Sequence, residues 1–368
     1  METMRVIISG GGTGGHIFPA IAIADAMRRR FSSAEILFIG ANGRMEMERV
    51  PRAGYPIEGL DISALQRSLS LSNLSFPFKL LKSLCRAKQI LKQFRPHYVV
   101  GVGGFASGPT LMAASRLGIP MFIQEQNSYP GITNRMLGKK AKAVFVAYES
   151  MDTWFPSDRI FVTGNPLRSQ ISNEVSRYDA ISHFNLDETR TTILVVGGSQ
   201  GALGINKGIA AQIDMLRGTS LQMIWQTGKG YLDTATALVK DRGLDDIVRP
   251  VAFIERMDMA YAAADVVISR SGAMSISELA IAQKPVIFVP LPTAAEDHQT
   301  KNAQRLVDKE AAMLVTNAEA ESQLIPALMK LAADPQRQEA MKANISAFAA
   351  PNAADDIVEH ITRLMNIQ

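Results

Sequence analysis

The sequence has 368 residues, of which 47% are hydrophobic and 20% charged, and this length favours two domains over one. Its one cysteine, Cys85, excludes an intrachain disulfide and fits a reducing compartment. Because no apolar run approaches the roughly 20 residues of a membrane-spanning helix and the N-terminus has no signal-peptide pattern, we expect a cytosolic or surface-bound protein.

The formal net charge of +4 is unevenly distributed. Residues 1–168 carry 21 basic and 11 acidic side chains, a net of +10, whereas residues 169–368 carry 18 and 24, a net of −6. Between Asp61 and Glu125 there is no acidic residue but there are eight basic ones, namely Arg67, Lys79, Lys82, Arg86, Lys88, Lys92, Arg95 and Arg116. This stretch is therefore a candidate surface for an anionic partner.

Apolar runs with β-strand character alternate with longer helical patterns along the whole chain. The runs lie at residues 6–9, 36–40, 98–103, 121–124, 143–147 and 160–164 and, in the second half, at 192–198, 221–227, 247–253, 265–269 and 285–290. Such alternation predicts parallel sheets flanked by helices, and therefore an α/β protein with two doubly wound, Rossmann-like domains.

An internal repeat supports the division into two domains. The stretch TILVVGGSQGALGIN at 192–206 repeats the opening pattern VIISGGGTGGHIFPA, in which a turn of small residues follows the first strand. The segment after GNPLR is polar and irregular. We therefore expect domains at 1–168 and 169–351, with a helix at about 352–368 that packs back on the first domain.

The first glycine-rich turn has two interpretations. Gly10, Gly12 and Gly15 fit the spacing G-x-G-x-x-G between a strand and a helix, where exposed N–H groups attract phosphate. A dinucleotide site also needs an acid near the end of the second strand, but the nearby acid, Glu35, stands at the wrong end. The turn therefore either admits another ligand or makes a close helix–strand contact.

The basic stretch contains an expected helix from about Lys79 to Phe94. Its apolar face comprises Leu80, Leu84, Ala87, Leu91 and Phe94, and Lys79, Lys82 and Arg86 lie opposite. Phe76 and Phe78 flank a proline in an expected loop before it, and this mixture of aromatic and basic residues suits an anionic membrane surface. Nucleic acid is not expected as a partner, because no recognition motif for it appears.

Three later turns of small residues also follow expected strands, at 101–109, 197–202 and 269–278. In the last, Ser271 and Gly272 can cap a helix beginning near Ala273, whose N–H groups suit a diphosphate. Glu278 could accept hydrogen bonds from two ribose hydroxyls, and Arg270 adds a cation. The alternative is a purely structural helix cap.

Together these turns resemble those of the GT-B glycosyltransferases. The shared motifs, in order, are GGGTGGHIFPA, GVGGFASGP, QEQNSYPGITNRML, GNPLR, GGSQGA, SRSGAMSISE and EDHQTKNA. They span essentially the whole chain, and seven linked motifs are far more specific than one glycine loop. The resemblance implies the GT-B fold, in which two Rossmann-like domains face an interdomain cleft, the first binding acceptor and membrane and the second binding UDP-GlcNAc.

The activity implied is inverting transfer of N-acetylglucosamine from UDP-GlcNAc to the C4 hydroxyl of a lipid-linked muramyl-pentapeptide in peptidoglycan synthesis, at the cytoplasmic face of the bacterial membrane. No D-x-D pair ends a strand, so we expect no metal and no other cofactor. A UDP-GlcNAc epimerase of the same fold and a non-catalytic UDP-GlcNAc sensor are the alternatives.

The resemblance also assigns site residues. Those matched to UDP-GlcNAc are Thr13, Gly14, Gly15, Asn127, Arg168, Ser199, Ile254, Ala273, Met274, Ser275, Ile276, Ser277, Glu278 and Gln299. The residues expected at the acceptor or membrane are Gly103, Gly104, Asn134, Phe76, Phe78, Lys79, Lys82 and Arg86, of which the aromatic and basic ones follow from the charge pattern described above.

His16 is the expected catalytic base, with a structural role in the loop as its alternative, and Glu125 is the second candidate base. The chain departs from the family pattern at Gln124, Phe105 and His298. Gln124 stands where a histidine is common, so an indispensable base is not expected at that position.

Overall fold

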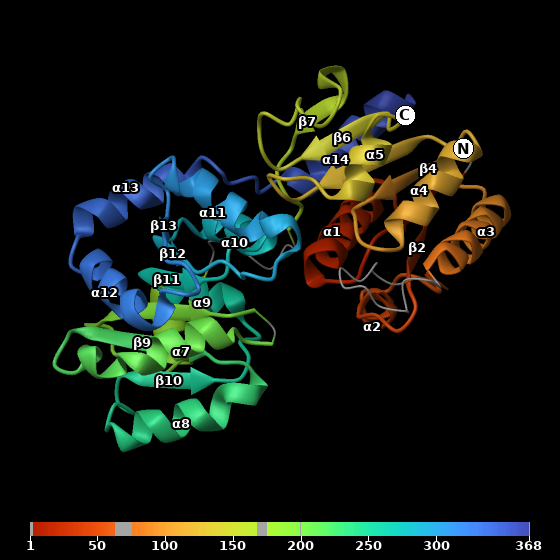
Figure 1. The fold of residues 1–368 in the computed structure, drawn as a ribbon. Helices are drawn as coiled ribbons and strands as arrows, with labels where there is room; N and C mark the ends of the chain where they lie inside the picture. Colours follow the sequence, from red (N-terminus) through yellow and green to blue (C-terminus); the bar gives the residue numbers. More distant parts are fainter. Residues whose placement is uncertain (1–2, 63–75, 168–174, 199, 368) are drawn as a thin grey trace. The chain divides into compact units, whose positions relative to one another are not determined.

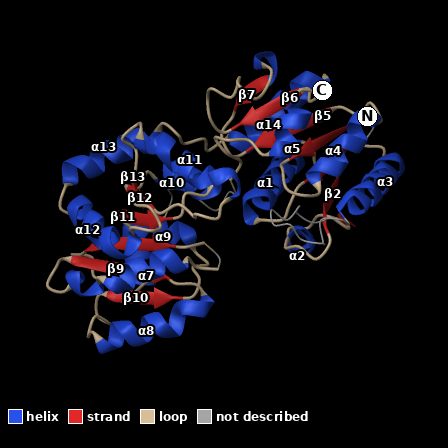
Figure 2. Ribbon diagram, in the orientation of Figure 1, coloured by secondary structure: helices blue, strands red, loops and turns tan. Residues whose placement is uncertain are grey.

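The computed structural model describes residues 3–62, 76–167, 175–198 and 200–367, and the chain folds into two compact units (Figure 1). The first unit comprises Met1–Arg168 and Ala350–Gln368, and the second comprises Ser169–Ala349. In each unit, helices cover the strands (Figure 2).

The first unit contains a parallel sheet of seven strands in the order β3-β2-β1-β4-β5-β6-β7. The strands are β1 (Arg5–Ser9), β2 (Glu35–Ala41), β3 (Ile57–Leu60), β4 (Tyr98–Gly101), β5 (Met121–Glu125), β6 (Ala143–Val146) and β7 (Ile160–Val162). Most central positions are buried on both faces, which explains why these strands read as continuous apolar runs. The order reverses between β1 and β4, which is where open sheets of this kind bind ligands.

Helices of the first unit pack on both faces of this sheet. They are α1 (Gly14–Arg30), α2 (Glu46–Arg52), α3 (Phe76–Phe94), α4 (Ser107–Arg116), α5 (Ile132–Gly138) and α14 (Ala353–Met365), with the 3₁₀ turn η2 (Ser157–Arg159). One core joins α1 and α14 to the sheet, and the other joins α3, α4 and α5 to it. The helix α14 buries Ile357, Val358 and Ile361 against the first unit, so the end of the chain completes that unit's core.

The second unit contains a parallel sheet of six strands in the order β10-β9-β8-β11-β12-β13. The strands are β8 (Thr191–Val196), β9 (Leu221–Gln226), β10 (Val248–Val251), β11 (Val266–Ser269), β12 (Val286–Phe288) and β13 (Met313–Leu314). Its order reverses between β8 and β11. The predicted α/β class with two doubly wound parallel sheets is therefore confirmed.

The helices of the second unit are α6 (Arg177–His183), α7 (Leu203–Ala211), α8 (Leu232–Asp241), α9 (Met257–Ala263), α10 (Ala273–Ala282), α11 (His298–Val307), α12 (Ala320–Ala332) and α13 (Pro335–Ser346). Three 3₁₀ turns, η3 (Ile213–Leu216), η4 (Lys229–Tyr231) and η5 (Ala295–Asp297), join them. The core forms where α7, α8 and α12 bury their apolar faces with the sheet.

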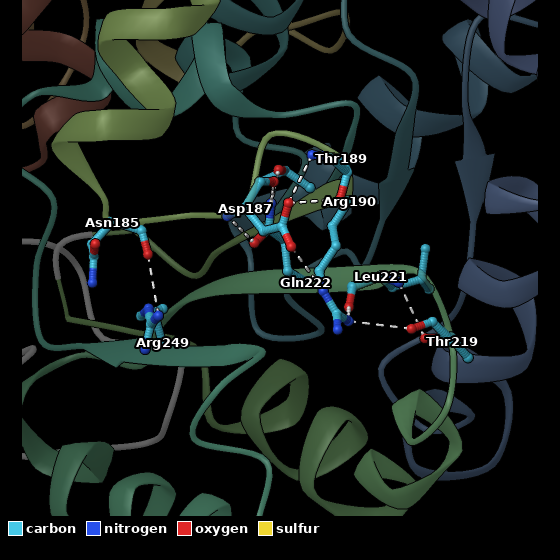
Figure 3. A network of polar contacts seen from close by, with 9 residues as sticks. Asn185, Asp187, Thr189, Arg190, Thr219, Leu221, Gln222 and Arg249 are labelled. Carbon is cyan, nitrogen blue, oxygen red and sulfur yellow. Dashed lines mark hydrogen bonds and ion pairs between the residues drawn. The ribbon is translucent and has the colours of Figure 1, made fainter.

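A polar network closes the amino-terminal edge of the second sheet (Figure 3). The Gln222 amide accepts a hydrogen bond from Asp187 N–H at 3.0 Å and donates to Asp187 O at 2.7 Å. The Asp187 carboxylate accepts from Thr189 N–H and Oγ1 at 2.8 and 2.6 Å, and these bonds lower the pKa of Asp187. Because β8 and β9 begin here, the network lies at the edge opposite the carboxyl ends of the strands and ties the segment before β8 to β9.

Candidate active site

The turns that follow β1 and β4 pack backbone against backbone. Gly11 N–H donates to Gly103 O at 3.3 Å. Gly104 has φ +85°, and a Cβ there would collide with Gly11 O. Only glycine allows both the backbone conformation and this separation. The dense glycines in the opening motif therefore serve, in part, a close contact between two turns.

A buried carboxylate lies beneath the first turn. Glu46, the first residue of α2, is 0% exposed. Its Oε2 accepts a hydrogen bond from Gly12 N–H at 2.9 Å, and its Oε1 accepts one from Ala41 N–H at 3.0 Å. A Cβ on Gly11 would contact the same carboxylate. The Gly12 N–H is thus bound to an internal anion, which the sequence analysis did not predict.

His16 lies in the first turn of α1, which begins after Thr13. Thr13 Oγ1 and His16 Nδ1 are 3.1 Å apart. A Cβ on Gly103 would lie 2.8 Å from Cδ2 and 3.0 Å from Nε2 of the imidazole. Thr13 and the glycine at 103 therefore set the position of the ring, with Nε2 on the side of the β4–α4 turn.

Glu125 ends β5 and is 2% exposed. Its Oε1 accepts from Asn127 N–H and Nδ2 at 2.9 and 3.2 Å, and its Oε2 accepts from Gly131 N–H and Asn134 Nδ2 at 3.2 and 2.8 Å. Burial raises the pKa of Glu125, and these hydrogen bonds oppose that rise. Two donors on each oxygen make this carboxylate the organiser of the loop from 126 to 134.

Asn134, which donates to Glu125, also has an amide oxygen without a hydrogen-bond partner among the described residues. The residue is 3% exposed. A Cβ on Gly103 would lie 3.8 Å from its Nδ2, so Asn134 adjoins the turn that contacts His16. Four sequence-predicted residues of the first unit, His16, Gly103, Glu125 and Asn134, thus form one neighbourhood.

The turn after β8 in the second unit is held by a neutral amide. Gln226, at the end of β9, accepts from Gly197 N–H at 3.2 Å through Oε1 and donates to Gly198 O at 2.7 Å through Nε2. Gly201 and Gly228 have φ of +75° and +77°, and a Cβ on either would collide with a backbone carbonyl of the facing turn. The predicted residue Ser199 lies outside the described residues, as does Arg168.

The helix α10 begins at Ala273, as predicted, after Gly272, and its N-cap has no side-chain hydrogen bond. The Ser271 hydroxyl donates instead to Gln299 O at 2.9 Å, so the prediction that Ser271 caps the helix is wrong. The half-buried Arg270 donates through Nη1 to Val289 O, Pro290 O and Asn317 Oδ1, each at 2.9 Å. The helix terminus and this cation together make the region attractive to an anion.

Glu278 is held by a residue that the sequence analysis missed. Tyr261, a buried residue of α9, donates its hydroxyl to Glu278 Oε2 at 3.0 Å. Burial and the charge of Glu278 raise the pKa of Tyr261 well above its usual range, so the hydroxyl remains a donor at neutral pH. Little in the sequence indicates Tyr261, because a tyrosine 17 residues before an acid forms no recognisable local motif.

The other predicted donor residues of the second unit lie on α10, in the segment before α9 and at the start of α11, whereas Thr13, Gly14, Gly15 and Asn127 belong to the first unit. Ala273, Ile276 and Ile254 are buried, Met274 and Ser275 are half-exposed, and Ser277 donates to Ala273 O within its own helix. Gln299 accepts from Leu291 N–H at 2.9 Å through its amide oxygen. A ligand contact by Gln299 would therefore use its NH2 group.

The structure of α3 and its neighbours differs from two expectations about the basic stretch. Phe76–Phe78 lies in the first turn of α3 and not in a loop, because proline is tolerated there. The stretch is also partly neutralised in space, since Lys82 pairs with Asp61 and Arg86 pairs with Glu58, each at 2.9 Å. The Phe76 side chain lies outside the described part of the chain.

One face of α3 remains apolar and basic. Phe78 is 77% exposed and Leu81 is 60% exposed, and Lys88 and Lys92 are exposed at helical spacing from them. Lys79 is also exposed. The opposite side buries Ala87, Ile90 and Leu91 in the core, and Leu84 is also buried, as predicted for most of these residues. We call Phe78, Leu81, Lys88 and Lys92 the α3 stripe.

Three or more His, Cys, Asp or Glu side chains do not gather into a cation-binding group within the described ranges. No helix in this part of the chain combines the length and apolar character needed to cross a bilayer.

Comparison with known proteins gives consistent matches along the chain. Residues 6–146 match the glycosyltransferase family 28 N-terminal domain, and residues 192–357 match the glycosyltransferase family 28 C-terminal domain. A Flavobacterium psychrophilum protein named UDP-N-acetylglucosamine--N-acetylmuramyl-(pentapeptide) pyrophosphoryl-undecaprenol N-acetylglucosamine transferase is 51% identical over 369 residues, covering 100% of both chains.

Solved structures agree with this match. Acinetobacter baumannii MurG has a TM-score of 0.80 and 31% identity, with 98% of this chain and 99% of that chain covered. A UDP-GlcNAc 2-epimerase from Neisseria meningitidis bound to UDP-GlcNAc has a TM-score of 0.68 and 17% identity, with 98% and 100% covered, and this likeness concerns the fold alone.

Proposed function

Because this chain belongs to glycosyltransferase family 28, we propose that it transfers N-acetylglucosamine from UDP-GlcNAc to the C4 hydroxyl of an undecaprenyl-pyrophosphoryl muramyl-pentapeptide, with inversion, in peptidoglycan synthesis. The family match and the 51% identity to a transferase of this name over the whole chain support the reaction. The structural observation that carries the donor assignment is the carboxylate of Glu278 on α10, which accepts a hydrogen bond from Tyr261 of the neighbouring helix α9.

The second unit holds the donor in this proposal. Glu278 accepts hydrogen bonds from the ribose hydroxyls, because Tyr261 orients its carboxylate and the residue lies on α10. The N-terminal N–H groups of α10 face the diphosphate, and the positive end of the helix dipole stabilises the charge that develops on the departing UDP. Arg270 adds a fixed positive charge at the same edge of the sheet.

The first unit supplies the base. His16 Nε2 takes the proton of the C4 hydroxyl while that oxygen attacks the anomeric carbon of N-acetylglucosamine. The bond from this carbon to the phosphate oxygen breaks, and UDP leaves with the electron pair. Attack from the face opposite UDP gives the β linkage. Glu125 orders the neighbouring loop and is not the base, because each of its oxygens already accepts two hydrogen bonds.

Product analysis with labelled donor tests the activity. The protein is incubated with UDP-GlcNAc labelled in the sugar and with a lipid-linked muramyl-pentapeptide. We expect label to enter the lipid phase only when the acceptor is present. A changed sugar nucleotide in solution would instead support an epimerase, and unchanged donor would support a sensor.

We also propose that the α3 stripe binds an anionic membrane surface, at the cytoplasmic face where the lipid acceptor is presented. Phe78 and Leu81 are exposed apolar side chains next to exposed lysines, and each lysine near an anionic leaflet contributes about 1 kcal/mol. Lys82 and Arg86 contribute less, because Asp61 and Glu58 already pair with them.

Co-sedimentation with anionic vesicles tests this surface. We expect Phe78→Ser with Leu81→Ser, and separately Lys88→Glu with Lys92→Glu, to lower binding and to lower activity on the lipid acceptor. Activity on a short-chain, water-soluble acceptor should survive. Tyr178→Ser is the matched control, because Tyr178 is 76% exposed but lies in the second unit. If vesicle binding changes neither with salt concentration nor in either double variant, the α3 stripe is not the membrane-binding surface.

A further inference from the structure

The internal anion beneath the first glycine-rich turn suggests a further residue of the reaction. We infer that Glu46 is a positioning residue, which holds the turn from Gly10 to Thr13 so that His16 stands at the start of α1 with Nε2 directed to the acceptor. This inference rests on the proposed role of His16 as base. Glu46 itself touches no substrate in it.

The hydrogen bonds require a carboxylate in this place. Both partners of Glu46 are backbone N–H donors, one from Gly12 and one from Ala41, and each donates to a different oxygen. A glutamine has one acceptor oxygen and one NH2 group, so one of the two N–H groups would face another donor. Because Glu46 is 0% exposed, water cannot replace the lost partner.

A short chain of contacts leads from Glu46 to His16. Gly12, which donates to Glu46, has φ +88° and precedes Thr13, the residue before α1. Thr13 Oγ1 lies 3.1 Å from His16 Nδ1. Moving Gly12 would therefore move the start of α1 and the oxygen that contacts the imidazole.

The turn also contacts the segment that follows β4. A Cβ on Gly12 would lie 3.1 Å from Cε2 of Phe105, and Gly11 donates to Gly103 O. Glu46 and the segment 103–105, which contacts the His16 ring, therefore both hold the turn. Without the Glu46 carboxylate, Gly12 N–H would lose its hydrogen-bond acceptor.

The experiment is a double-mutant cycle on transfer to a soluble acceptor, with Glu46→Gln, His16→Ala and the two combined. We expect Glu46→Gln to lower kcat about ten- to a hundredfold, the range of loss when a catalytic group is slightly misplaced. The Kd for UDP should change less than about twofold, because the donor belongs to the other unit. In the His16→Ala background, Glu46→Gln should cause little further loss.

Controls separate positioning from folding. Glu48→Gln is the matched variant, because Glu48 lies on the same helix, is 60% exposed and pairs with the exposed Arg52. It should keep normal kcat. Thermal unfolding is followed for every variant. If Glu46→Gln does not fold, Glu46→Asp replaces it, since aspartate keeps both acceptor oxygens but is one methylene shorter.

The outcomes distinguish the two assignments. Normal turnover of His16→Ala alone would overturn the base assignment. A deficient His16→Ala combined with a normal Glu46→Gln would overturn the Glu46 inference and leave the base intact. Losses that multiply in the double variant would also overturn it, since Glu46 would then act independently of His16.

Discussion

The turns after the first strand of each sheet differ in the group that holds them. Both β1 and β8 are followed by glycines that lie against a neighbouring turn, and both are fixed by one buried side chain. In the first unit this is the carboxylate of Glu46, and in the second it is the amide of Gln226. The two glycine-rich sequences are similar, but the side chain beneath the first turn is a carboxylate and the one beneath the second is a neutral amide.

This difference suggests how one fold carries two tasks. An ionised carboxylate beneath the first turn repels a second anion and already binds Gly12 N–H, so this turn is suited to positioning His16 rather than to a nucleotide diphosphate. A neutral amide beneath the second turn satisfies the backbone without adding charge. We therefore expect diphosphate recognition to belong to the second unit.

The largest expected effect is on catalysis in the first unit. His16→Ala should lower kcat by about 10²- to 10⁴-fold, the usual contribution of a general base, and leave UDP affinity nearly intact. Steady-state kinetics and UDP titration check both parts. Loss of UDP binding in this variant would contradict the separation of tasks between the units.

Truncation of Glu278 probes the other side of the comparison. Glu278→Ala removes the charged acceptor of the hydrogen bonds donated by the ribose hydroxyls. Loss of one net bond of this kind, worth about 1.5–3 kcal/mol, should weaken UDP binding about ten- to a hundredfold. Calorimetric titration of UDP measures this. Equal affinities of the two proteins would remove Glu278 from the ribose site.

Gln226→Glu places a carboxylate beneath the second turn, as Glu46 does beneath the first. The variant loses the donor that bonds to Gly198 O at 2.7 Å and adds a negative charge beneath the turn. We expect UDP affinity to fall about tenfold, corresponding to roughly 1.4 kcal/mol. Gln323→Glu, an exposed change of equal charge, is the control. Unchanged affinity would show that the charge beneath the turn does not matter.

The smallest expected effect comes from the partner of Glu278. Tyr261→Phe keeps the buried ring but removes one neutral-to-charged hydrogen bond. Because Glu278 remains, UDP should bind only a few-fold more weakly, and thermal stability should fall slightly. A loss as large as that of Glu278→Ala would mean that Tyr261 contacts the nucleotide itself.

Much of the fold was predictable because its signals are local. Apolar runs of four to seven residues marked most strands, since a parallel strand buried on both faces needs no alternation. The start of α10 at Ala273 followed from the small residues before it. The loop expected at Phe76–Phe78 was wrong because proline fits both a loop and the first turn of a helix, and the local pattern does not distinguish them.

Residues of the candidate site could be predicted only where they lie inside a recognisable sequence motif. His16, Glu125 and Glu278 stand inside recognisable segments. Glu46 contacts a turn 34 residues before it, and Tyr261 contacts an acid 17 residues after it, so no spacing rule could connect them. The acid-free stretch was misleading for the same reason, because Asp61 and Glu58 meet Lys82 and Arg86 across β3 and α3.

The sequence by itself determined the two parallel sheets, the helix faces that cover them and the segments at which glycine-rich turns follow strands, because periodicity, glycine and proline act over a few residues. Only the tertiary structure decided which side chain lies beneath each turn. That choice depends on where α2 begins and where β9 ends relative to β1 and β8, and therefore on packing between segments that are distant in the chain. Charge and hydrogen bonding act through space, so the difference between Glu46 and Gln226 became meaningful only once the sheets were folded.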